Sequence, residues 1–105
     1  MIEDTQAVEN IERIVKEVQG IGVLLIGEGD LTQELGCPRQ YDSPELLRRM
    51  AHVLEIGKAY DIPVGHPHVT NDNVASVIEQ GYRFLMTYPK RDFSALEQGR
   101  KLAGR

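Results

Sequence analysis

The sequence lacks the features that mark secreted, disulfide-stabilised or membrane-spanning proteins. Its 105 residues include one cysteine, Cys37, so no disulfide can form within the chain, as is usual in a reducing cytosol. The longest apolar run is only a few residues, whereas a membrane-spanning helix needs about 20. Residues 1–4 have neither the basic start nor the apolar core of a signal peptide. These absences predict a cytoplasmic protein with no membrane partner.

Basic side chains are also not concentrated in any segment. The chain has 12 lysines and arginines against 16 aspartates and glutamates, for a formal net charge of −4. A nucleic-acid-binding face needs a dense basic patch, so no nucleic-acid partner is expected. The remaining composition is that of an ordinary globular protein, with 41% apolar and 27% charged residues. The length suits one small domain and is too short for two, which predicts a single domain over residues 1–105.

Helical and strand patterns alternate along the chain. Over residues 5–18, apolar residues recur at three- and four-residue steps, which predicts an amphipathic helix that Asp4 or Thr5 can cap. Residues 21–26 form a continuous apolar run, typical of a strand in a parallel sheet. The Ser-Pro-Glu sequence at residues 43–45 is a strong helix start. The predicted elements are strands at residues 1–3, 21–26, 62–65 and 84–87, helices at residues 5–18, 43–58, 70–81 and 92–102, and an irregular loop at residues 31–41.

This order of elements predicts an α/β fold with a parallel sheet. Two architectures agree with it: a small open sheet, or four βα units that make half of an eight-stranded barrel, a fold of about 250 residues. In both, functional groups lie at the carboxyl ends of the strands. Polar and glycine-rich clusters follow the predicted strands at those ends, at Glu3 and at residues 27–30, 65–68 and 87–90. The pattern therefore predicts a site at this edge of the sheet.

Glu3 and Asp30 follow two neighbouring predicted strands. Two carboxylates at one sheet edge suit a hard divalent cation such as Mg²⁺ or Mn²⁺, which prefers oxygen ligands. The glycines on either side of Glu28 would let the backbone amides of Gly29 and Asp30 approach an anionic group. The alternative interpretation is that Asp30 caps a local turn and that Glu3 is a frayed terminal residue. The spacing leaves both interpretations open.

Histidines and the cysteine give weaker signals. His66-Pro67-His68 invites a zinc interpretation, but no third ligand with suitable spacing is evident, so a polar loop stiffened by proline is favoured. His52 lies within a predicted helix and has no visible partner. Cys37 has no recognisable base beside it in the sequence, so a nucleophilic role is not predicted.

Five segments together resemble one enzyme family: "MIE", "GVLLIGEGDLTQELG", "DSPELLRRM", "GKAYDIPVG" and "QGYRFLMTYPKRDFSAL". They are similar to the C-terminal half of the class II, metal-dependent pyruvate aldolases. This family comprises the 4-hydroxy-2-oxo-heptanedioate and 2-dehydro-3-deoxy-glucarate aldolases and is related to the citrate lyase β-subunit. The resemblance covers essentially the whole chain. Its most specific parts are the glutamate that ends one strand and the Gly-x-x-Asp-Leu-Ser/Thr turn that ends the next.

The resemblance implies a fold, a cofactor and a set of site residues. By it, the chain is the C-terminal half, four βα units, of a TIM-type (βα)8 barrel in an enzyme that usually forms hexamers. Glu3 and Asp30 match the ligands of a divalent metal, Mg²⁺ or Mn²⁺, and the amides of Gly29 and Asp30 match those that hold the pyruvate carboxylate. The implied reaction is aldol cleavage or condensation of a 2-oxo acid with release of pyruvate. The implied partners are a small 2-oxo acid and further copies of the chain.

The sequence departs from this family pattern in three ways. Glu28 stands where the family has proline, and an added acid there would repel a carboxylate substrate or draw an extra cation. Residues 87–90 replace a glycine-containing turn. The family's catalytic histidine and substrate-binding arginine belong to the other half of the barrel, so the chain alone is expected to be weakly active or inactive. The alternative is a non-catalytic half-barrel that binds a metal or a small acid, or a truncated gene product.

Overall fold

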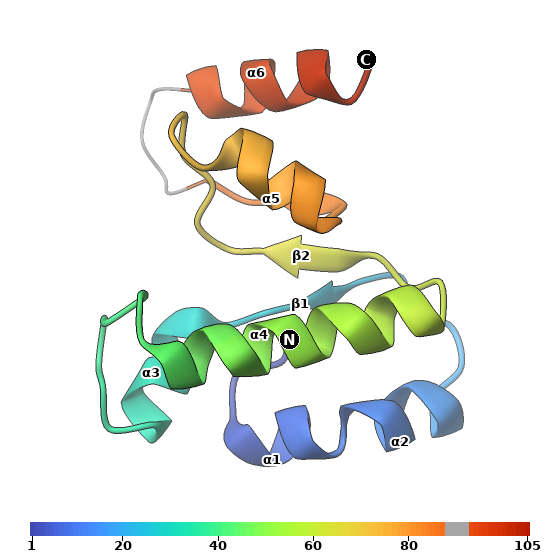
Figure 1. The fold of residues 1–105 in the computed structure, drawn as a ribbon. Coiled ribbons are helices and arrows are strands. Elements are labelled where there is room, and N and C mark those ends of the chain that lie inside the picture. Colours follow the sequence, from blue (N-terminus) through green and yellow to red (C-terminus); the bar gives the residue numbers. More distant parts are fainter. Residues whose placement is uncertain (88–92) are drawn as a thin grey trace.

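The computed structural model describes residues 1–87 and 93–105, in which short strands alternate with helices. The elements in chain order are α1 (Thr5–Glu9), α2 (Ile11–Glu17), β1 (Leu24–Leu25), α3 (Glu28–Glu34), α4 (Pro44–Ala59), β2 (Val64–His66), α5 (Val74–Gln80), β3 (Phe84–Leu85) and α6 (Ser94–Leu102). The strands form a parallel sheet in the order β1-β2-β3. Ile2 adds one parallel bridge to Ile26 beyond β1. Figure 1 shows β1 and β2 between α1 and α2 at one end and α5 and α6 at the other.

The α/β class and the parallel sheet are thus confirmed, while several boundaries differ from the prediction. The strand expected at residues 1–3 is reduced to the single bridge of Ile2. The helix expected over residues 5–18 is divided at Asn10 into α1 and α2. Asp4 caps α1 as predicted, because its side chain accepts a hydrogen bond of 2.6 Å from the backbone N–H of Ala7. In the described part of the chain, no helix is long and apolar enough to cross a membrane.

The irregular loop predicted over residues 31–41 is wrong in its first part, where the chain forms α3. Leu31 and Thr32 are fully buried, and their burial holds a seven-residue helix that would not be stable alone. The last helix begins at Ser94, one of the two predicted starts. The other, Asp92, lies outside the described residues, as do the predicted strand-end residues 88–90.

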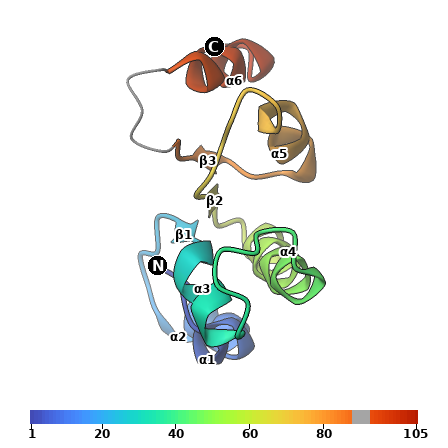
Figure 2. The same ribbon diagram turned by 90° about the vertical axis from the view of Figure 1, so that its left-hand side faces the viewer.

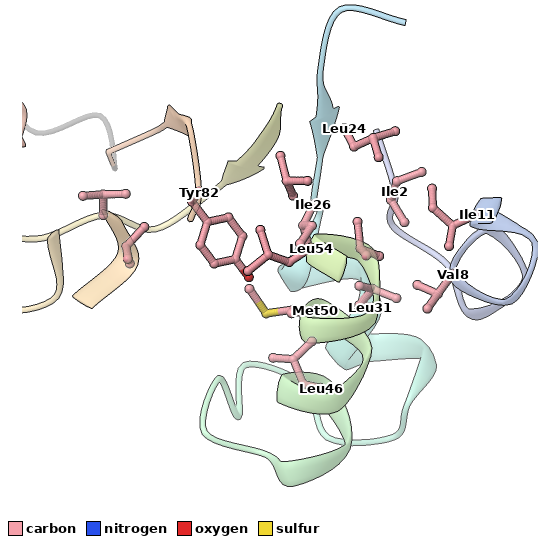
Figure 3. Close-up of a cluster of buried hydrophobic side chains, with 14 of the residues drawn as sticks. Ile2, Val8, Ile11, Leu24, Ile26, Leu31, Leu46, Met50, Leu54 and Tyr82 are labelled. Atoms are coloured by element: carbon pink, nitrogen blue, oxygen red, sulfur yellow. The ribbon is translucent and has the colours of Figure 1, made fainter. Parts of the chain in front are cut away.

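One face of the sheet packs against the helices. Leu24, Ile26 and Val64 are buried there. Gly57 lets α4 approach β2, because a Cβ atom at Gly57 would lie 2.2 Å from Cγ2 of Val64. Burying a side chain of the size of valine or leucine contributes roughly 2 kcal/mol, so this cluster stabilises the strands on their helix side. Figure 3 shows its labelled members: Ile2, Val8, Ile11, Leu24, Ile26, Leu31, Leu46, Met50, Leu54 and Tyr82.

The opposite face of the sheet carries apolar side chains that remain partly open to solvent. A Cβ atom on Gly65 would lie 2.7 Å from Cδ1 of Leu25 and 3.0 Å from Cδ1 of Phe84, so these three residues share this face. Phe84 is 44% exposed, and Met86, two residues further on, is 39% exposed. Figure 2 shows β1, β2 and β3 following one another, with α4 and α5 on the same side of them and apart from each other.

Candidate functional site

Glu3 and Gly27 lie side by side just after the bridge between Ile2 and Ile26. The N–H of Ile2 donates to the carbonyl of Leu25 at 2.7 Å, and the N–H of Gly27 donates to the carbonyl of Ile2 at 2.7 Å. A Cβ atom on Gly27 would lie 2.6 Å from Cβ of Glu3 and 3.3 Å from its Oε2. Glycine at position 27 therefore makes room for the Glu3 side chain. This is the edge of the sheet at which the sequence predicted a site.

Asp30 lies in the first turn of α3, three residues after Gly27, and is exposed. The turn is tightly bonded, because the N–H of Leu31 donates to the carbonyl of Gly27 at 3.1 Å. The hydroxyl of Thr32 donates to the carbonyl of Gly29 at 2.7 Å. A Cβ atom on Gly29 would meet nothing within 4 Å, so the space beside this glycine is open.

The two acids at this edge are of the residue type that a hard cation binds together with other ligands. Glu3 and Asp30 both supply exposed carboxylate oxygens, and Gly27 leaves the space that Glu3 occupies. Within residues 1–87 and 93–105, no group of three or more His, Cys, Asp or Glu side chains could hold a metal ion. A site of two carboxylates matches Mg²⁺, which is commonly bound through one or two carboxylates together with water or substrate oxygens. The same set would not suit a structural zinc site, which takes four ligands.

A cavity of about 760 Å³ opens on the helix side of the sheet, between α4 and α5. Its walls combine apolar residues of α4 with polar residues of α5. Its lining residues are Glu28, Tyr41, Leu47, Met50, Ala51, Leu54, Glu55, Lys58, His66, His68, Thr70, Asn73, Ser76, Val77, Gln80 and Tyr82. Glu3, Gly29 and Asp30 do not line it, so the predicted site residues face a different part of the molecule.

Glu28 belongs to this cavity. Its side chain is 4% exposed, and one carboxylate oxygen contacts Nδ1 of His68. The ring of Tyr41 lies 5.1 Å from the ring of His68, tilted by 57°. Burial lowers the pKa of His68, which favours the neutral ring. A neutral imidazole can donate its Nδ1–H to a carboxylate, so the pair satisfies a buried acid.

His66 is not arranged as a metal ligand. Its Nδ1 accepts the backbone N–H of His68 at 3.2 Å, and its ring meets the ring of Tyr82 edge-on, with centroids 5.0 Å apart. Burial lowers the pKa of His66 and raises the pKa of Tyr82 to about 12. Both groups are therefore held in their neutral forms near neutral pH. His52 is exposed on α4. The backbone N–H of Cys37 donates to the carbonyl of Thr32 at 2.9 Å.

The pairing of Glu28 with His68 is the feature that the sequence did not reveal. The two residues are 40 positions apart, and only the tertiary fold brings the start of α3 to the loop that follows β2. A buried partner could have been suspected, because an acid between two glycines after an apolar strand has no cation near it in sequence. Nothing in the pattern indicated which residue would supply that partner.

Comparison with known proteins places the chain in an enzyme family. The family model for HpcH/HpaI aldolase/citrate lyase matches residues 1–87. The 2-dehydro-3,6-dideoxy-6-sulfogluconate aldolase of Pseudomonas putida is 32% identical over 83 residues, which are 79% of this chain and 32% of that enzyme. The chain thus spans about a third of that relative's length.

Solved structures agree in fold. An HpcH/HpaI aldolase/citrate lyase family protein from Burkholderia cenocepacia J2315 superposes with a TM-score of 0.77 at 28% identity, covering 97% of this chain and 38% of that one. The citrate synthase SbnG superposes with a TM-score of 0.78 at 25% identity, covering 99% of this chain and 42% of that one. The match of the family model over residues 1–87, supported by these relatives, decides the assignment. The chain belongs to the HpcH/HpaI aldolase/citrate lyase family.

Proposed function

We propose that the chain is part of a metal-dependent aldolase that cleaves or forms a carbon–carbon bond in a 2-oxo acid, with pyruvate as the product of cleavage. The observation that carries the proposal is the contact between Glu3 and Gly27, with Asp30 in the turn that follows. Because Glu3 lies so close to Gly27 that a side chain at position 27 would collide with it, the neighbouring strand restricts where the Glu3 carboxylate can lie. Family membership supplies the reaction class.

Each residue has a separate role in this proposal. Glu3 and Asp30 would hold Mg²⁺ or Mn²⁺ through carboxylate oxygens. When bound, the ion would supply Lewis acidity to the ketone of the substrate. The N–H groups of Gly29 and Asp30 would receive the substrate carboxylate, and the absence of a side chain at Gly29 leaves the approach open. The hydroxyl of Thr32 holds the carbonyl of Gly29, which fixes the plane of the peptide that carries the N–H of Asp30.

The rest of the site would come from outside this segment. In this proposal residues 1–105 are one domain made of four βα units of a (βα)8 barrel, and the catalytic base lies on the other units. The apolar face around Leu25, Phe84 and Met86 favours association with further chain, because Phe84 and Met86 are exposed and exposed apolar patches promote association. We therefore include a homo-oligomer in the proposal.

Metal titration tests the proposal directly. Isothermal titration with Mn²⁺ should give a binding signal with the native chain that is lost in Asp30→Asn. Asp61→Asn is a matched control, because Asp61 has a side chain 96% exposed, lies after α4, and sits at φ 52°, a conformation that asparagine also tolerates. Unchanged binding in Asp30→Asn, or an equal loss in Asp61→Asn, contradicts the assignment of Asp30.

A second candidate is a non-catalytic module that binds a metal or a small acid. It is favoured by the placement of the histidines: His66 and His68 line the cavity that excludes Glu3 and Asp30, and His52 lies exposed on α4. An aldol cleavage assay on 4-hydroxy-2-oxo acids with added Mn²⁺ tests the non-catalytic candidate. Cleavage at rates ordinary for enzymes would contradict both the non-catalytic candidate and the expected absence of a base.

A further inference from the structure

Glu28 occupies a position where the backbone has little intrinsic rigidity. It is flanked by Gly27 and Gly29, and glycine loses more conformational freedom on folding than any other residue. Glu28 is also the first residue of α3, so its placement sets the direction of the helix. Of the three residues in this stretch, only Glu28 has a side chain that can tie the backbone to another element. That side chain is 4% exposed.

The partner of Glu28 is itself firmly held. His68 contacts the Glu28 carboxylate through Nδ1. The carbonyl of His68 accepts a hydrogen bond of 2.9 Å from Nδ2 of Asn73, whose Oδ1 accepts the N–H of Thr70 at 2.7 Å. The ring of Tyr41 lies against the imidazole at 5.1 Å. The contact therefore connects the start of α3 to a bonded loop at the end of β2.

We propose that Glu28 and His68 form a positioning pair that fixes the first turn of α3 and so directs the Asp30 carboxylate. This inference rests on the proposed function for the role of Asp30. Residues 28, 31 and 32 are buried and anchor one side of α3, whereas Asp30 is exposed on the other. Rotation of the first turn would carry Asp30 with it. The contact of Glu28 with His68 thus restrains the backbone between Gly27 and Gly29, as a conformationally rigid residue at position 28 would.

A positioning role and a purely electrostatic role of Glu28 predict different results for a substitution that keeps the shape of the side chain and removes its charge. In Glu28→Gln the side-chain carbonyl can still accept the Nδ1–H of His68, so the position is kept and only the charge is lost. In Glu28→Ala the contact is lost. Proline at this position would restrain the turn by its ring, since the first position of a helix accepts proline. A positioning role therefore predicts that Gln and Pro are tolerated and Ala is not.

The experiment measures Mn²⁺ affinity by isothermal titration in the full chain. Glu28→Ala and His68→Ala should each weaken Mn²⁺ binding about tenfold, the usual lower bound for losing a residue that orients a metal ligand. The variant with both substitutions should bind Mn²⁺ no more weakly than the single variant with the lower affinity, because each single substitution already removes the same contact. Glu28→Gln and Glu28→Pro should remain close to the native affinity. Glu55→Ala, exposed on the wall of the same cavity, and His52→Ala, on the exposed side of α4, are matched controls and should leave binding unchanged.

Hydrogen exchange of the backbone amide of Leu31, which donates to the carbonyl of Gly27 across the first turn of α3, gives a second measurement that needs no metal. Glu28→Ala should accelerate exchange there, and Glu28→Gln should not. Absence of Mn²⁺ binding by the native chain would defeat the proposed function, and the exchange rates would then decide the positioning role alone. Equal weakening by Glu28→Ala and Glu28→Gln, additive losses in the double variant, or unchanged exchange in Glu28→Ala would each overturn the inference.

Discussion

The acidic residues near the carboxyl edge of the sheet differ in burial and in whether they are paired within the protein. Away from the cavity between α4 and α5, Glu3 and Asp30 are exposed and have no ion-pair partner among the described residues. On the helix side, two residues away from Asp30, Glu28 is buried and satisfied by His68. An exposed carboxylate pays no desolvation and remains available to a cation, whereas a buried one must be bonded within the protein. Neighbouring acids in one short stretch thus serve as a candidate ligand and as an anchor.

This contrast corrects one expectation from the sequence. The sequence predicts that Glu28, as an added acid, repels a carboxylate substrate or draws an extra cation. In the structure its carboxylate contacts His68 in the cavity between α4 and α5, which Glu3, Gly29 and Asp30 do not line. The buried contact removes the reason for expecting Glu28 to repel the substrate. We expect Glu28→Pro to be tolerated, because the proline ring can replace the restraint that the tertiary contact provides.

The largest effect that separates the two sides should come from Gly27→Ala. The added methyl group would lie 2.6 Å from Cβ of Glu3, which is closer than side chains approach one another, so Glu3 or the bridge to Ile2 must move. We expect a loss of about 2 kcal/mol in the free energy of unfolding, typical of overpacking, and loss of Mn²⁺ binding. Urea unfolding and isothermal titration measure the two effects. Native stability with native affinity would show that Glu3 is not confined by Gly27.

Association through the open sheet face should be the next largest effect. Phe84 and Met86 are 44% and 39% exposed on a parallel sheet. Replacing both with serine should shift the chain towards monomer, because it removes apolar area that a second copy or a further part of the barrel would cover. Light scattering of native chain and variant at equal concentration measures this. The matched control is Leu47→Ser, since Leu47 is 50% exposed on α4 instead; equal shifts in both variants would argue against a role of the sheet face.

A smaller effect should appear as a pH dependence of stability on the helix side. Burial lowers the pKa of His66 from 6.5, so the folded state resists a proton that the unfolded chain accepts. This contribution to stability is fully present above pH 6.5 and is lost as the pH falls through the lower pKa of the folded state. The melting temperature should therefore fall as the pH is lowered from about 7.5, one unit above the ordinary histidine pKa, towards the lower pKa of the folded state. His66→Gln should weaken this dependence, and His52→Gln, at an exposed position, should not.

The smallest effect on stability should come from Gly29→Ala. A Cβ atom there meets nothing within 4 Å, and alanine is a better helix former, so stability should be unchanged or raised by up to about 1 kcal/mol. Pyruvate binding in the presence of Mn²⁺ should nevertheless weaken, because the methyl group would occupy the open approach to the amides. Thermal unfolding and isothermal titration with pyruvate measure the two properties. Unchanged pyruvate binding would remove Gly29 from the proposed carboxylate site and leave the metal ligands untouched.

The sequence by itself determined the alternation of helices and strands, and with it the parallel sheet and the edge at which Glu3 and Asp30 lie. Those features depend on local periodicity and on local signals such as the cap of Asp4 and the glycine that ends α5, Gly81, with its φ of 103°. These features could be predicted because the local sequence patterns favour the same elements that the final packing stabilises.

Other features were decided only by the tertiary structure. One of them is α3, which exists because Leu31 and Thr32 are buried. The break at Asn10, by contrast, is local, because the side-chain amide of Asn10 donates to the carbonyl of Gln6 at 2.9 Å. The pairing of Glu28 with His68 has no local signal, since a buried carboxylate takes whichever donor the fold brings to it. Periodicity could predict where the strands end, but the burial of an acid and its partner depend on contacts between residues far apart in the chain.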